Sequence, residues 1–262
     1  MYVESAGLLG PGLTGWTQSR AILTGGAPHL PDAVKLTAHG ALPPVERRRV
    51  CESVKLALSV GMEAVAGSGR APDALATIFV SSSGDGMVIH EICEALVRPE
   101  REVSPTRFHN SVHNAPAGYW SIAARSHAPS TSLCAHEWSF AAGLLEASGQ
   151  LTDGADALLL MSYDLPYPPP LSAAAPITGV LGAALLLLRE RSAGCFARLE
   201  LQLEATPRRA TRLQAPSLEA LRAGNATGRA LPLLQALATP SAAEVVLDYL
   251  GTGSLALAVT PC

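Results

Sequence analysis

The chain contains three largely apolar runs, at residues 75–83, 155–163 and 179–188, and they restrict the folds open to it. The longest uncharged apolar run, residues 179–188, has ten residues, about half of the roughly 20 that a helix needs to cross a bilayer. Runs of this length fit strands that are buried on both faces of a sheet. We therefore expect no membrane span and an α/β protein with a mostly parallel sheet.

Helical patterns separate these runs. The first is predicted to begin at Pro44 and to end at Gly67, because its apolar residues recur at steps of three and four. Three further helices are predicted at residues 87–97, 114–124 and 138–148. Strands that alternate with helices in this way are typical of a sheet covered by helices on both faces.

The last third of the sequence has a different pattern. Residues 164–176 are rich in proline and predict irregular structure. Consecutive strands are expected at 178–190 and 195–205, and residues 207–239 hold two short helical patterns at most. Gly251-Thr252-Gly253 joins two further apolar segments and predicts a hairpin.

The composition indicates that part of the surface is covered by another molecule and that the protein occurs in a reducing compartment. Only 16% of the 262 residues are charged and 48% are hydrophobic, whereas about a quarter of the residues in a typical globular domain are charged. A partner subunit is the simplest cover for such a surface. The net charge of −3 argues against a nucleic-acid partner. Five scattered cysteines and the lack of a basic, apolar leader predict a cytoplasmic protein without a disulfide framework.

Cys134 is the sharpest chemical candidate. We expect a short strand at residues 128–134 to deliver it to the first turn of the next helix, where the helix dipole favours a thiolate. An acyl-accepting nucleophile and a small buried core residue are both compatible with that position. His136 and Glu137 lie too close along the same turn to act as a base and its orienting partner, so cap or interface positions are expected for them.

Other chemical motifs are missing from the sequence. His109 and His113 lack further ligands at metal-binding spacing, so no metal site is expected. Gly84-Asp85-Gly86 predicts a turn, because no phosphate-loop pattern follows it. No G-x-S-x-G motif occurs, and no histidine follows His136. We therefore predict no cofactor.

The segments around Cys134 resemble those of β-ketoacyl synthases. FHNSVHNAPAGYWSIA (108–123) is similar to the stretch before their active-site cysteine, and STSLCAHEWSFAAGLLEA (130–147) is similar to their nucleophile segment. ADALLLMSYD and TGVLGAALLLLRE resemble the strands that follow. The resemblance covers residues 1–190 and implies a thiolase-like layered α/β fold, which residues 191–262 would complete as a shortened second half.

The sequence is more specifically similar to the short β-ketoacyl synthase-like chain length factors found beside aryl polyene pigment enzymes in bacteria. That similarity lies in YVESAGLLGPGLTGW, ALPPVERRR and SVHNAPAGYWSIA. By this resemblance Cys134 falls at or beside the nucleophile position, but Ala135-His136-Glu137 replaces the usual residues. The family's active members also need two histidines and a lysine from the second half, and this chain has no histidine there.

These observations lead to one main hypothesis and two alternatives. The chain is expected to be catalytically silent, to form a heterodimer with a complete β-ketoacyl synthase, and to shape the tunnel for an acyl chain carried by an acyl carrier protein. The expected tunnel or interface residues are Phe108, His113, Asn114, Gly118, Tyr119, Trp120, Cys134 and Trp138. The alternatives are a Cys134-dependent acyltransferase or thioesterase acting on carrier-protein thioesters, and a scaffold that holds the carrier protein near other enzymes.

Overall fold

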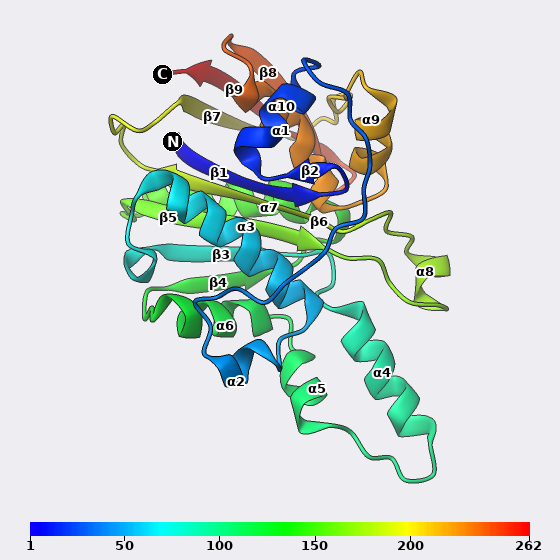
Figure 1. The fold of residues 1–262 in the computed structure, drawn as a ribbon. Helices are drawn as coiled ribbons and strands as arrows, with labels where there is room; N and C mark the ends of the chain where they lie inside the picture. Colours follow the sequence, from blue (N-terminus) through cyan, green and yellow to red (C-terminus); the bar gives the residue numbers. More distant parts are fainter.

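The computed structural model describes residues 1–262 and contains a single nine-stranded sheet (Figure 1). Its strands are β1 (Tyr2–Gly10), β2 (Leu13–Thr14), β3 (Ala76–Val80), β4 (Ser130–Leu133), β5 (Ala157–Asp164), β6 (Leu181–Leu188), β7 (Ala197–Glu204), β8 (Ala243–Tyr249) and β9 (Gly253–Pro261). Their order is β4-β3-β5-β6-β1-β7-β9-β8, and β2 pairs with β1. β4 and β8 are therefore the two ends of the strand order.

The prediction of a mostly parallel sheet is wrong. Only β3 pairs in parallel, with β4 and with β5. All other pairings are antiparallel. A parallel neighbour requires a crossover, usually a helix, whereas β5 and β6 are joined by the proline-rich segment, whose only helix is the single turn α8 (Leu171–Ala174). The predicted hairpin at Gly251 is confirmed, because β8 pairs directly with β9.

The remaining helices lie between and around these strands. They are α1 (Trp16–Leu23), α2 (Pro44–Arg47), α3 (Glu52–Ser68), α4 (Gly86–Val97), α5 (Pro105–Asn110), α6 (Ala115–Ala124), α7 (Ser139–Thr152), α9 (Pro216–Ala223) and α10 (Leu231–Ala238). Three short 3-10 turns complete the fold: η1 (Pro72–Ala74), η2 (His136–Trp138) and η3 (Thr227–Ala230). No helix is both long and apolar enough to cross a membrane.

The single helix predicted from Pro44 to Gly67 is in fact two helices, α2 and α3. The chain leaves the helical path at residues 48–51, where Cys51 is extended with a ψ of 173°. There the Asn110 side chain donates a hydrogen bond of 2.7 Å to Arg49 O, which holds this break against α5. α3 continues past Gly67 and ends at Gly69, whose φ of 69° suits a glycine cap.

Two apolar cores lie on opposite faces of the sheet. α3 and α6 pack on one face, around a cluster of 20 buried residues. α7 and α10 belong to the other core, a cluster of 35 buried residues. α7 contacts β3 and β5 and also β8, so the sheet curves around this helix (Figure 1). The η3 turn contacts β5 and β6, and Thr227 bonds to Asp164 at the carboxyl end of β5.

One ion pair in α9 predicts a pH dependence of stability. Arg222, which is almost fully buried, donates hydrogen bonds of 2.7 and 2.8 Å to Glu219, and Leu213 N donates a third of 2.9 Å. The Arg222 hydrogen bond is the main reason that the pKa of Glu219 falls from 4.5 to about 2. A folded-state pKa below the unfolded value means that ionised Glu219 stabilises the fold above pH 4.5, and that this gain is lost as the pH falls towards 2.

We therefore expect Glu219→Gln to lower the free energy of unfolding at pH 7, and the difference from the wild type to shrink steadily between pH 4.5 and about 2. Urea unfolding at several pH values measures this difference. Glu100→Gln is the matched control, since Glu100 is exposed and forms no ion pair. A difference that stays constant down to pH 2 would contradict the assignment.

Candidate functional site at the ends of the central strands

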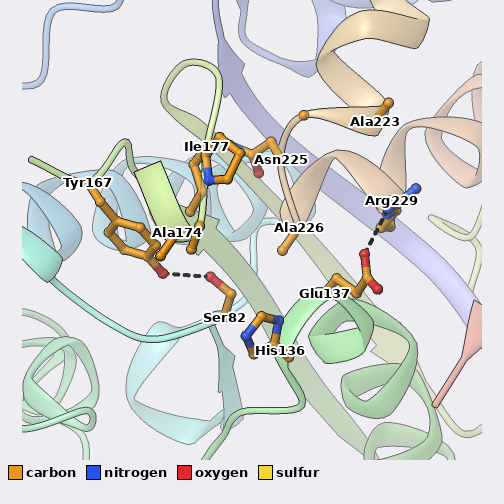
Figure 2. Close-up of a pocket in the computed structure, with 13 residues that line it drawn as sticks. Ser82, His136, Glu137, Tyr167, Ala174, Ile177, Ala223, Asn225, Ala226 and Arg229 are labelled. Carbon is orange, nitrogen blue, oxygen red and sulfur yellow. Dashed lines mark hydrogen bonds and ion pairs between the residues drawn. The ribbon is translucent and has the colours of Figure 1, made fainter. Parts of the chain in front are cut away.

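A cavity of about 280 Å³ lies at the carboxyl ends of β3, β4 and β5 (Figure 2). Because these strands are parallel, their carboxyl ends share one edge, which is where open α/β sheets commonly bind ligands. The lining comes from the segments after all three strands and from the α9–η3 region. It comprises Ser82, His136, Glu137, Tyr167, residues 174–177, residues 223–226 and Arg229.

A fully buried carboxylate, Asp164 at the end of β5, organises this edge. Its Oδ1 accepts hydrogen bonds from Ser82 N (2.8 Å), Ser82 Oγ (2.6 Å) and Ser81 Oγ (3.2 Å). Its Oδ2 accepts from Thr227 N (3.0 Å) and Thr227 Oγ1 (2.8 Å). Burial raises the pKa of Asp164, and the hydrogen bonds from Ser82 and Thr227 oppose that rise. Asp164 thus fixes both the loop after β3 and the η3 turn.

The loop after β3 is also fixed by hydrogen bonds of Tyr167 and Asp85. The Tyr167 hydroxyl bonds to Ser82 Oγ at 3.2 Å and to Ser83 Oγ. Asp85 caps α4 by accepting from Val88 N at 3.1 Å, which confirms the predicted turn into that helix. Its second oxygen accepts from Ser53 N at the start of α3 at 3.2 Å. The loop is therefore rigidly placed beside the cavity.

Cys134 does not lie in the first turn of the following helix, contrary to the prediction. The 3-10 turn η2 separates it from α7, because the Ser139 hydroxyl donates to His136 O (2.6 Å) and accepts from Ala135 N (3.0 Å). The Cys134 thiol is exposed and donates a hydrogen bond of 2.7 Å to Ser82 O. It is absent from the cavity lining.

His136 and Glu137 line the cavity instead. His136 has a φ of 55°, a left-handed conformation that is uncommon for residues other than glycine. Glu137 pairs with Arg229, at 3.0 Å between Oε2 and Nη2. Figure 2 shows His136, Glu137 and Arg229 on one side of the cavity, with Ala174 and Ile177 on the other. The strand-to-helix turn after β4, with His136 in a left-handed conformation, thus forms one side of the cavity.

The structure separates the other predicted site residues. Tyr119 and Trp120 are only 1% and 2% exposed and pack inside the chain, where Trp120 meets Phe79 edge to face with the ring centroids 6.4 Å apart. These two side chains do not reach the surface. Trp138 is half-buried in η2. His113 Nε2 lies 3.5 Å from Ser81 O, beside the loop after β3.

Phe108 is 67% exposed and lies on a surface groove of about 480 Å³ whose lining does not include Cys134. Asn114 and Gly118, both exposed, line the same groove together with Val112. The eight predicted residues therefore fall into an internal core, the loops near the cavity and this outer groove.

Sequence reasoning missed Asp164, Tyr167, Thr227 and Arg229. Asp164 had a usable signal, since it is an ionisable residue directly after a buried apolar strand. Arg229 had none, because 92 positions separate it from the Glu137 that it pairs with. No group of three or more His, Cys, Asp or Glu side chains is arranged to hold a metal ion.

The geometry defines a layered α/β protein with a ligand-sized cavity at the strand-to-helix turn after β4. The family described as Beta-ketoacyl synthase, N-terminal domain matches residues 16–245. The chain belongs to this family, and its mixed α/β fold is the thiolase-like fold that the sequence motifs predict.

Solved structures support the fold assignment. The chain is similar to a chain in the complex of a ketosynthase (ApeO) with its chain length factor (ApeC) from Xenorhabdus doucetiae: identity is 20%, the TM-score is 0.73, and the match covers 98% of this chain and 99% of that one. It is also similar to the ishigamide ketosynthase/chain length factor, with 14% identity, a TM-score of 0.73 and 99% of both chains covered.

A β-ketoacyl synthase from Burkholderia phymatum STM815 matches over 87% of this chain and 69% of its own, with 13% identity and a TM-score of 0.64. None of the curated proteins matches the chain by sequence.

Proposed function

We propose that this chain is a non-catalytic chain length factor that pairs with a complete β-ketoacyl synthase in polyketide or fatty-acid-like biosynthesis of the aryl polyene type. The observation that carries the proposal is an apolar surface on α4, α5 and α6. Seven of the twelve exposed large hydrophobic side chains lie on these helices or on the turn between α5 and α6. We call them the α4–α6 surface: Met87, Ile89, Leu96, Val97, Phe108, Val112 and Ile122. Exposed apolar patches of this kind mark interaction sites.

The strand next to this surface supports the same interpretation. β4 contacts α6 and is the end strand of the sheet, so its outer N–H and C=O groups have no neighbouring strand. Open edge strands pair readily with another chain. An apolar surface beside an open sheet edge suits a partner subunit. Two of the similar solved structures are a ketosynthase with its chain length factor and a ketosynthase/chain length factor.

The surroundings of Cys134 support the non-catalytic part of the proposal. Its thiol donates a hydrogen bond of 2.7 Å to Ser82 O. No imidazole bonds to the sulfur, and no histidine follows His136 in the sequence. Condensation needs donors that stabilise the developing oxyanion, and losing even one such donor costs about 10²–10³-fold in rate.

The proposal also assigns roles to the two parts of the chain and to its partners. Residues 1–190 form the synthase-like half, and residues 191–262 complete the fold as a shortened second half. The acyl carrier protein brings the growing chain to the active partner, in the cytoplasm. Phe108, with Asn114 and Gly118 on the same groove, is the residue we propose to limit the depth of the partner's acyl tunnel.

Co-expression with a complete synthase and carrier protein from the same gene neighbourhood tests pairing. We expect a one-to-one complex by light scattering, and product only when both subunits are present. The double variant Phe108→Asp/Val112→Asp should weaken pairing by about a hundredfold or more, because unpaired charges would be buried in the interface. Leu30→Asp is the control, since Leu30 is 70% exposed and outside the α4–α6 surface. Pairing that survives the double variant would contradict the proposed interface.

The exposed position of Cys134 at the sheet edge keeps one alternative open, an acyltransferase or thioesterase that uses this thiol. Cys134→Ala separates the two functions. A chain length factor should retain product formation within about twofold, whereas the alternative requires this variant to abolish turnover. Condensation by the isolated chain would overturn the proposed function outright.

A further inference from the structure

The cavity beside η2 contains polar side chains that are already satisfied. Ser82 Oγ donates to Asp164, and the Tyr167 hydroxyl bonds to Ser82 and Ser83. The Asn225 side chain donates to Gly179 O at 3.0 Å and accepts from Gly228 N at 3.3 Å. None of these groups needs a further partner, so they form the frame of the cavity.

Two side chains in the lining have unused hydrogen-bond donors, His136 and Arg229. The His136 imidazole has no hydrogen-bond partner, although its backbone is held in the left-handed region. Arg229 makes a single hydrogen bond within the protein, to Glu137, although a guanidinium has five N–H donors. Its Nε is buried without an acceptor, and the side chain is only 19% exposed. A buried donor without an acceptor is costly.

The missing partner must therefore be an acceptor, and a negative charge suits a guanidinium best. Glu137 is the one carboxylate in the lining, and at 47% exposure solvent screens its charge. The rest of the lining is apolar: Ala174, Ala175, Pro176, Ile177, Ala223 and Ala226. A volume of about 280 Å³ equals that of roughly nine waters at about 30 Å³ each. The ligand thus combines an anionic head with a short hydrocarbon tail.

We propose that this cavity binds a short-chain carboxylate, with its head between His136 and Arg229 and its tail on the alanine-rich wall. The site uses neither Cys134 nor the α4–α6 surface. It is therefore independent of the proposed function, and either can fail without the other.

Butyrate binding to the full chain, followed by NMR titration, tests the site. Butyrate should bind, and butyramide, which has the same shape without the charge, should bind at least about tenfold more weakly. Inorganic phosphate, which has no tail, should also bind more weakly than butyrate. Equal affinity for butyrate and butyramide would overturn the proposal, as would tighter binding of phosphate.

Two variants separate ligand binding from a purely structural role of the Glu137–Arg229 pair. Arg229→Met should weaken butyrate binding by about tenfold or more, because it removes the cation. Glu137→Gln should strengthen binding a few-fold, because it frees Arg229 from a competing carboxylate. Both variants break the same ion pair, so a structural role alone would shift them in the same direction, and that result would overturn the proposal. Circular dichroism checks that both variants fold.

Discussion

Asp164→Ala is expected to lower the free energy of unfolding by about 3–5 kcal/mol. The change removes the acceptor of five hydrogen bonds, donated by Ser81, Ser82 and Thr227. These donors are buried, so water does not readily replace the lost acceptor. Urea unfolding followed by circular dichroism measures the loss.

Two comparisons sharpen this test. Asp164→Asn keeps one acceptor oxygen and should lose roughly half as much stability, because a smaller number of donors is left unpaired. Asp32→Ala, at an exposed aspartate, should change the free energy of unfolding by less than about 0.5 kcal/mol. If Asp164→Ala cost no more than Asp32→Ala, Asp164 would not organise the site as described.

Trp120→Ala is expected to lower the free energy of unfolding by about 3–5 kcal/mol. Trp120 is 2% exposed and fills the core between α3, α6 and the sheet. Its ring lies so close to α3 that a Cβ added at Gly61 would sit 2.9 Å from it. Removing the indole leaves a cavity that the surrounding side chains cannot fill. Thermal or urea unfolding of the purified chain tests this expectation.

Phe108→Ala is the matched aromatic comparison. Phe108 is 67% exposed, so its removal should change stability by about 0.5 kcal/mol or less. Under the proposed function the same variant should lengthen the acyl product in complex with the synthase, as read by mass spectrometry. A stable Trp120→Ala variant would contradict the core assignment. An unchanged product length with Phe108→Ala in an intact complex would instead favour a scaffold.

Burial made part of the fold predictable. The runs that became β3, β5 and β6 are apolar because both faces of these strands are covered, and that requirement is visible in the residues themselves. An apolar run does not reveal whether a strand pairs in parallel or antiparallel with its neighbour, so the prediction of a mostly parallel sheet was wrong. β1 was not predicted, since Glu4 and Ser5 interrupt its apolar run.

The site was less predictable than the fold. The position of Cys134 is set by a turn whose geometry depends on the Ser139 hydroxyl. The periodicity of apolar residues in the sequence does not predict such a contact. Asp164 meets Thr227, and Glu137 meets Arg229, only after the sheet has curved around α7. Such pairs depend on the tertiary arrangement and not on local sequence.

The position of β1 has a consequence for how the chain is made. Residues 2–10 leave the ribosome well before residues 181–204, yet β1 lies between β6 and β7, with Val3 opposite Leu187 on one side and Ala197 on the other. At about 5–20 residues per second, synthesis of the intervening segment takes roughly 10–35 s. During that time β1 lacks β6 and β7, so its apolar side chains are accessible to chaperones and to other nascent chains. β1 is thus translated long before it can take its place in the sheet.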